Sequence, residues 1–184
     1  MPINHFKNTH NHYGVISIAL HWLMAVTLIG MYFLGDYMVD LNYYDDWYQS
    51  APSWHKSIGI VLACLLLFRI FWMSVQIKPA SLIKNKWLAQ LIFFTHIGML
   101  FLLIIIVISG YLISTADGRA IVIFNLFEIP ATITSIKDQE DVSGELHFYM
   151  ATALMFISGF HALAALVHHF IYKDKTLRRM LGIS

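Results

Sequence analysis

The stretch SGELHFYMATALMFISGFHALAALVHHFIY, residues 143–172, decides the fold class of this chain. It is apolar over most of its length, and a helix of that length exceeds the roughly 30 Å of a bilayer's hydrocarbon core. Four histidines lie within it: His147, His161, His168 and His169. Ionisable side chains inside a bilayer are costly and commonly mark functional sites. The stretch therefore predicts a membrane-spanning helix that carries part of such a site.

The spacing of these histidines places three of them on one side of the helix. His147 and His161 are 14 residues apart, so their side chains differ by roughly 40° in direction and lie about 21 Å apart along the axis. His168 follows seven residues after His161 and stays on that side. A histidine on an apolar helix can also be a hydrogen-bonded packing residue. Partner histidines on other helices are therefore needed before metal ligation is inferred.

The composition is that of a membrane protein. Of the 184 residues, 58% are hydrophobic and 12% are charged, which is far from an ordinary soluble domain. The formal net charge of +1 gives no reason to expect a nucleic-acid partner. Cys64 is the only cysteine, so the chain has neither a disulfide of its own nor a CxxCH motif for covalent haem attachment. Any haem is therefore expected to be b-type.

Four apolar runs are long enough to span a membrane. We expect the spans at about residues 14–35, 53–74, 87–114 and 143–172. The predicted fold class is therefore all-α, an integral membrane four-helix bundle that forms one domain over residues 1–184. Residues 1–13 are polar and are expected to be a solvated tail. The longest loop is 115–142, and its middle, 121–129, is apolar enough to lie on the membrane surface or to cap the bundle.

The distribution of charge predicts the orientation. Nine of the twelve Lys and Arg residues lie in the two terminal segments and around the 75–86 loop: Lys7, Arg69, Lys78, Lys84, Lys86, Lys173, Lys175, Arg178 and Arg179. The other two loops hold Lys56, Arg119 and Lys137 together with ten of the eleven acidic residues. Basic residues stay on the cytoplasmic side of a membrane protein. Both termini are therefore predicted to be cytoplasmic.

Depth in the membrane then pairs the histidines. His21 lies near the cytoplasmic start of the first span, and His55 lies near the outer start of the second. His21 thus reaches the depth of His161, and His55 reaches that of His147. Neutral imidazole is a good ligand for haem iron. Two per iron leave no open coordination position, which suits electron transfer rather than oxygen activation. We therefore predict two haem b groups at two depths.

Three more polar side chains lie within the spans. Arg69 follows His55 by 14 residues; it either extends to the lipid headgroups or binds a haem propionate. His96 has three interpretations: it replaces another ligand, contributes to a quinone site, or forms a hydrogen bond within the bundle. His168 lies between the cytoplasmic haem and the basic surface. Because histidine titrates near neutral pH, we interpret His168 as a quinone-site residue, with a position among the headgroups as the alternative and the better interpretation of His169.

At these residues the sequence resembles the bacterial cytochrome b561 family. The matching stretches are ALHWL around His21, WHKSIGI around His55, LFRIFW with Arg69, GELHFYMA around His147, and GFHALAALVHHFIYKDKTLRRM at the end. The resemblance implies a four-helix dihaem cytochrome of the bacterial inner membrane. It also implies the same ligand pairs, His21 with His161 and His55 with His147.

The resemblance further implies superoxide oxidation, in which superoxide gives up its electron outside and ubiquinone is reduced near the cytoplasmic side. Lys56 and Arg119 are then the groups that attract the anion, although the many outer carboxylates oppose this attraction. As an enzyme the chain is then a superoxide–ubiquinone oxidoreductase. Two alternatives stay open: a haem-b membrane-anchor subunit linking a periplasmic redox protein to the quinone pool, and a transporter or receptor without haem.

Overall fold

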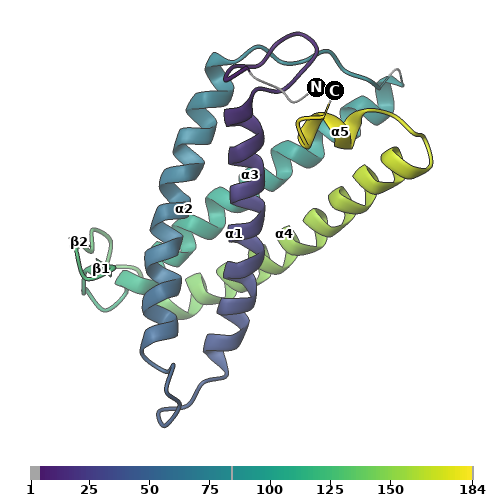
Figure 1. Ribbon diagram of the computed structural model, residues 1–184. Coiled ribbons are helices and arrows are strands. Elements are labelled where there is room, and N and C mark those ends of the chain that lie inside the picture. Colours follow the sequence, from purple (N-terminus) through teal and green to yellow (C-terminus); the bar gives the residue numbers. More distant parts are fainter. Residues whose placement is uncertain (1–4, 84, 184) are drawn as a thin grey trace. The chain divides into compact units, whose positions relative to one another are not determined.

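The computed structural model describes residues 5–83 and 85–183, and α-helices make up most of that part of the chain. Its four long helices are α1 (Val15–Val39), α2 (Ser50–Val75), α3 (Lys86–Thr115) and α4 (Gln139–Phe170), followed by the short α5 (Thr176–Met180) (Figure 1). Each long helix has the length and composition to cross a membrane. The helical expectation is thus confirmed, with elements that suit a membrane helical bundle. Lys84, which the charge count includes, lies outside the described residues.

Local capping explains where the helices begin. The side-chain oxygen of Asn85 accepts hydrogen bonds from the amides of Trp87 (2.9 Å) and Leu88 (3.3 Å), which is how a residue before a helix satisfies free amides. Pro52 lies in the first turn of α2, where its missing N–H has no partner to lose. Helix α4 begins four residues earlier than its apolar run because its first turn is acidic, and acidic groups are favourable at a helix N-terminus.

The chain forms two compact units, and each takes one end of every long helix. Unit 1 consists of Met1–Val26, Leu65–Met99 and Phe156–Ser184, and unit 2 consists of Thr27–Cys64 and Leu100–Met155. His21 and His161 belong to unit 1, whereas His55 and His147 belong to unit 2. Each histidine pair therefore lies within a single unit.

In unit 1 the segment before α1 is held in place by hydrogen bonds. The side-chain oxygen of Asn8 accepts from the amide of Gly14 (2.9 Å) and the hydroxyl of Ser17 (2.7 Å). The amide of Asn8 donates to the side chain of Gln76 (3.0 Å), and Trp72 Nε1 donates to Ser17 Oγ (3.0 Å). Most of the described residues of the expected solvated tail are exposed, and one asparagine ties the segment to the residues that follow α2.

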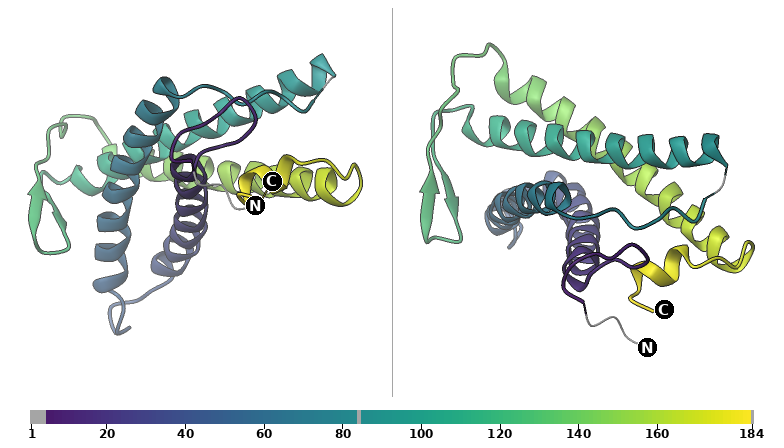
Figure 2. Two further views of the ribbon diagram at one scale, coloured as in Figure 1. Left: turned by 45° about the horizontal axis from the view of Figure 1, so that its top comes forward. Right: turned by 90° about the horizontal axis from the view of Figure 1, so that it is seen from above.

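In unit 2 the loop after α3 contains a short antiparallel hairpin, an element that the all-α expectation did not include. Strands β1 (Ile121–Ile123) and β2 (Phe127–Ile129) pair with Ile121 opposite Ile129 (Figure 2). Ile121 and Ile123 are buried and Val122 is exposed, which is the alternation of a strand with one covered face. Ile121 and Ile123 therefore serve a small local core, whereas the other large apolar side chains of 121–128 are exposed.

The hairpin turn contacts α2 next to His55. Phe124 has φ of 47°, a left-handed conformation that is unfavourable for a bulky residue. Its amide donates to Ser57 Oγ (3.1 Å), and its ring packs edge-on against Trp54, with centroids 5.5 Å apart. These two contacts offset the conformational free energy that the left-handed backbone costs at Phe124.

Candidate metal centres at two histidine pairs

Four of the predicted ligands meet in two pairs. In unit 1 the ring centroids of His21 on α1 and His161 on α4 lie 6.3 Å apart, with the ring planes at 63°. In unit 2 the rings of His55 on α2 and His147 on α4 lie 6.2 Å apart at 67°. Helical periodicity and membrane depth predict these same two pairs.

The separations match two imidazoles on opposite sides of one metal ion. A metal–imidazole bond is about 2.0 Å, and the ring centroid lies roughly 1.1 Å behind the nitrogen, so the two centroids are expected about 6.2 Å apart. In the described part of the chain no group of three or more His, Cys, Asp or Glu side chains is placed to hold a metal ion. A bare ion would therefore lack ligands. A haem brings four nitrogens of its own and needs only two from the protein.

Hydrogen bonding orients one ring of the unit 2 pair. His147 Nδ1 lies 2.9 Å from the carbonyl oxygen of Ile106 and 3.2 Å from the hydroxyl of Ser109. A ring N–H that donates to a backbone carbonyl leaves the other nitrogen, Nε2, with its lone pair free for a metal. Across residues 5–83 and 85–183, the buried Nδ1 of His55 has no hydrogen-bond partner. In the described part of the chain, a hydrogen bond at Nδ1 thus orients the ring of His147 but not that of His55.

Two glycines leave room for the rings of the unit 2 pair. A Cβ on Gly35 would lie 3.2 Å from Cε1 of His55, and a Cβ on Gly110 would lie 3.1 Å from Cε1 of His147. By contrast, a Cβ on Gly30 of α1 or Gly98 of α3 would have no neighbour within 4 Å. Among the glycines within the four long helices, an approach this close occurs only beside these two histidines. The sequence alone does not show which ring each glycine faces.

His96 lies beside the unit 1 pair but is not placed as a further axial ligand. Its ring centroid is 4.9 Å from that of His161, at 84°, which is too short for a metal ion between the two rings. Its Nδ1 lies 2.7 Å from the carbonyl oxygen of Ile92 on its own helix. Of the three interpretations of His96, the hydrogen-bonded neighbour has the most support.

Arg69 provides positive charge next to the same pair. The residue lies on α2 within unit 1, the unit that holds His21 and His161. A cationic side chain within a membrane span is stabilised by a nearby anion. The position suits a side chain that neutralises a carboxylate of a group bound between His21 and His161.

The two cations expected to attract an anion differ in their surroundings. Lys56 is exposed near the start of α2. Arg119 is also exposed, but its Nε donates to Asp117 at 2.6 Å and its guanidinium makes a second contact with the same carboxylate. The hydrogen bonds from Arg119 hold the pKa of Asp117 below its ordinary value. Asp117 therefore stays anionic at neutral pH and offsets much of the charge of Arg119.

Charge is divided unequally between the two units. Unit 2 has three basic and ten acidic residues, a formal charge of −7, and all ten acidic residues are exposed. Unit 1 has nine basic residues and one acidic residue, a formal charge of +8. An anion that approaches unit 2 therefore meets an unfavourable average field.

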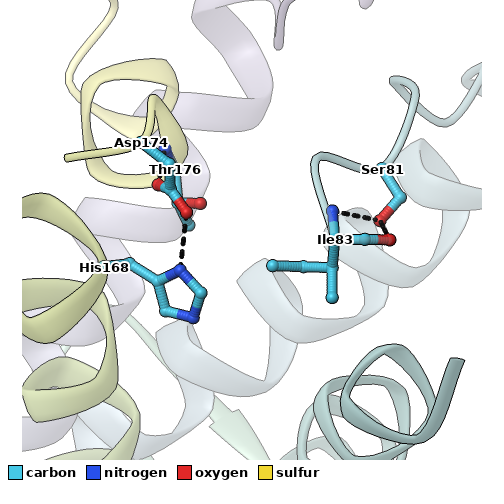
Figure 3. Close-up of polar contacts among 5 residues, drawn as sticks. All are labelled: Ser81, Ile83, His168, Asp174 and Thr176. Carbon is cyan, nitrogen blue, oxygen red and sulfur yellow. Dashed lines mark hydrogen bonds and ion pairs between the residues drawn. The ribbon is translucent and has the colours of Figure 1, made fainter. Parts of the chain in front are cut away.

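His168 is paired with a carboxylate that the sequence did not single out. Its Nδ1 lies 2.6 Å from Oδ2 of Asp174 (Figure 3), and the two side chains are 14% and 26% exposed. The available signal was that Asp174 is the one acidic residue of unit 1, set between Lys173 and Lys175. That pattern alone does not show which side chain the carboxylate reaches.

A family model described as prokaryotic cytochrome b561 matches residues 12–182. The chain belongs to the prokaryotic cytochrome b561 family. Cytochrome b561 homolog 2 of Escherichia coli (strain K12) is 47% identical over 180 residues, which cover 97% of this chain and 96% of that protein. Probable superoxide oxidase CybB of Yersinia pestis is 29% identical over 180 residues, which cover 94% of this chain and 97% of that protein.

The resemblance inferred from the histidine-containing stretches is thus confirmed. As a member of the cytochrome b561 family, the chain is a membrane protein of electron transport, and the cofactor of the family is b-type haem. The two histidine pairs fit this cofactor in separation and in donor chemistry.

Proposed function

We propose that this cytochrome holds two haem b groups, one between His21 and His161 and one between His55 and His147. It passes electrons across the bacterial inner membrane between an outer-side donor and ubiquinone. The observation that carries this proposal is the separation of the two ring pairs, 6.3 Å and 6.2 Å. A haem held by two imidazoles supplies one-electron transfer between ferric and ferrous iron and offers oxygen no open position.

The surrounding residues position these ligands. The Ile106 carbonyl accepts the hydrogen on His147 Nδ1, which leaves Nε2 as the nitrogen that would bind the iron. Arg69, on α2 within the same unit as His21 and His161, would neutralise a propionate of the haem that this pair holds. The charge of unit 1 supports a cytoplasmic location for both termini.

Ubiquinone reacts at the cytoplasmic end, next to the haem of unit 1. His168 is the residue that we assign to this site. It lies two helical turns beyond His161 on the same side of α4, and a quinone that gains electrons needs a proton donor. His96 is a second candidate side chain for the quinone site, because it is exposed and lies beside His161 in the same unit.

Superoxide is the donor that the relatives suggest, because one of them is named as a probable superoxide oxidase. Each superoxide anion gives up one electron and becomes dioxygen, and two of them reduce one quinone, which also takes up two protons. Lys56 and Arg119 are the cations that attract the anion to unit 2.

A second candidate function is supported by the charge of unit 2. Ten exposed carboxylates, together with the ion pair between Asp117 and Arg119, discourage a small anion. The same surface suits a partner protein with a basic face, because complementary charge guides association. In this case the chain is a haem-b membrane-anchor subunit that relays electrons between a periplasmic redox protein and the quinone pool.

Stopped-flow reduction of the haems by superoxide, with and without ubiquinone, tests both candidates. Rapid reduction followed by quinone-dependent reoxidation supports a self-contained superoxide–ubiquinone oxidoreductase. Slow reduction by superoxide, in protein whose haems still respond to ubiquinol, supports the anchor subunit. A purified protein without haem contradicts both candidates.

A further inference from the structure

Asp174, in the turn that follows α4, contacts both the ring and the backbone of His168. Its Oδ2 lies 2.6 Å from His168 Nδ1, and its own amide donates to the carbonyl oxygen of His168 (3.1 Å). Its other oxygen, Oδ1, accepts the amide of Thr176 (2.8 Å), the first residue of α5. Lys173, with φ of 52°, reverses the chain so that Asp174 returns to the ring. The carboxylate is therefore held at both oxygens, and its position relative to the imidazole is fixed.

This contact decides which nitrogen of His168 is free. Burial raises the pKa of Asp174, but hydrogen bonds from Thr176 and His168 outweigh burial and leave that pKa below its ordinary value. A carboxylate that stays ionised can only accept hydrogen bonds, so Nδ1 of His168 must carry a hydrogen. The other ring nitrogen, Nε2, points away from Asp174 (Figure 3). It is the atom that His168 can present to a ligand.

The segment that holds Asp174 also returns to the histidine pair of unit 1. Helix α5 is joined to α1 by a hydrogen bond of 2.7 Å from Trp22 Nε1 to the carbonyl oxygen of Met180. The Trp22 ring in turn lies 5.4 Å from the ring of His21. The turn and α5 thus connect the surroundings of His168 with those of the proposed haem ligand His21.

We propose that Asp174 is a positioning residue for quinone chemistry, which keeps the hydrogen of His168 on Nδ1 and presents Nε2 to a quinone oxygen. The inference rests on the proposed function, which supplies the two electrons. One of the two protons passes from Nε2–H to the quinone oxygen, so that an N–H bond breaks and an O–H bond forms. The ring that remains is neutral, with its hydrogen on the nitrogen that faces Asp174. Water then protonates Nε2 again and supplies the second proton to the quinone.

The test compares Asp174→Ala with His168→Gln and with Lys175→Ala, which removes an exposed neighbouring side chain. Haem content should be the same in all variants. Asp174→Ala should lower kcat for ubiquinone reduction by about tenfold or more, since a positioned proton donor contributes roughly 10²-fold or more to rate, while KM changes little. Added formate, a small carboxylate, should restore part of the loss in Asp174→Ala and none of it in His168→Gln. Lys175→Ala should match the wild-type protein.

A second readout does not depend on turnover. Nuclear magnetic resonance of protein with ¹⁵N-labelled histidine reports which ring nitrogen carries the hydrogen. The resonances that disappear in His168→Gln belong to the His168 ring. They should show hydrogen on Nδ1 in the wild-type protein and a mixture of tautomers in Asp174→Ala. An unchanged tautomer or an unchanged kcat in Asp174→Ala overturns the role of Asp174. So does a loss of kcat that formate does not restore, since that result indicates a structural role. If the wild-type protein does not reduce ubiquinone, the proposed function and this inference are both overturned. If the wild-type protein reduces ubiquinone and Asp174→Ala does so at the same rate, only the inference is overturned.

Discussion

Gly110 on α3 lies directly against the imidazole of His147 on α4, because a Cβ at this glycine would be 3.1 Å from Cε1 and 3.3 Å from Nδ1 of the ring. Contacts of this length force one partner to move by a few tenths of an ångström. The ring is also held from its own side by the Ile106 carbonyl. A methyl group at Gly110 therefore acts on the ring that we assign to the iron of unit 2.

Gly110→Ala should keep both haems and shift the absorption maximum and midpoint potential of one of them. The physical reason is that the added methyl group turns or displaces the axial ring without removing it. Gly98→Ala is the matched control on the same helix, since its Cβ would have no neighbour within 4 Å. The control should leave both haems unchanged and gain about 0.5–1 kcal/mol of helix stability. Redox titration followed by absorption spectroscopy measures both variants, and identical titrations for the two would contradict the assignment.

His147→Ala should remove one haem and keep the other, because the ligands of the unit 1 pair do not include this residue. The pyridine haemochrome assay should fall to half of the wild-type haem content per chain. His169→Ala is the control on the same helix, and it should retain the full content. Full haem content in His147→Ala would show that the pairing is wrong.

His96→Leu should retain both haems. Its ring lies 4.9 Å from that of His161, so His161 has no space for an iron on that side. Electron paramagnetic resonance of the oxidised protein should show two low-spin signals, as in the wild type. Loss of one signal would mean that His96, and not His21, supplies the ligand opposite His161.

The ion pair between Asp117 and Arg119 allows a two-sided test of superoxide attraction. Lys56→Gln combined with Arg119→Gln should slow haem reduction by superoxide and weaken its dependence on salt. Asp117→Asn should have the opposite effect, because it frees the guanidinium that the carboxylate offsets. Stopped-flow rates at several ionic strengths compare the wild-type protein with both variants. Equal rates in every variant would favour the anchor-subunit candidate, whose partner does not depend on these two cations.

The histidine pairs could be predicted from the sequence because two simple constraints fix them. Helical periodicity places His147 and His161 on one side of α4, and the membrane limits each to partners at its own depth. The helix lengths followed from hydropathy in the same way. Hydropathy does not place the helix ends, because it does not register capping or charge effects. Helix α4, for example, begins before its apolar run with a polar first turn.

The features that could not be predicted depend on single contacts between distant residues. The hairpin turn has two left-handed residues, Phe124 and Asn125. Asparagine favours this conformation, but phenylalanine does not, and contacts with Ser57 and Trp54 of α2 stabilise the turn at Phe124. The segment before α1 is polar, as a solvated tail would be, and is ordered by Asn8. Asp174 reaches His168 only because the chain reverses at Lys173.

The division of charge between the units has a consequence for how the chain is inserted during synthesis. The nine basic residues of unit 1 come from three separate parts of the sequence. In the orientation that we propose, with both termini cytoplasmic, each part contributes to the retention of its end on the side where synthesis takes place. The signal is therefore redundant. No single Lys or Arg substitution should invert the protein, and inversion would require changes in several segments at once.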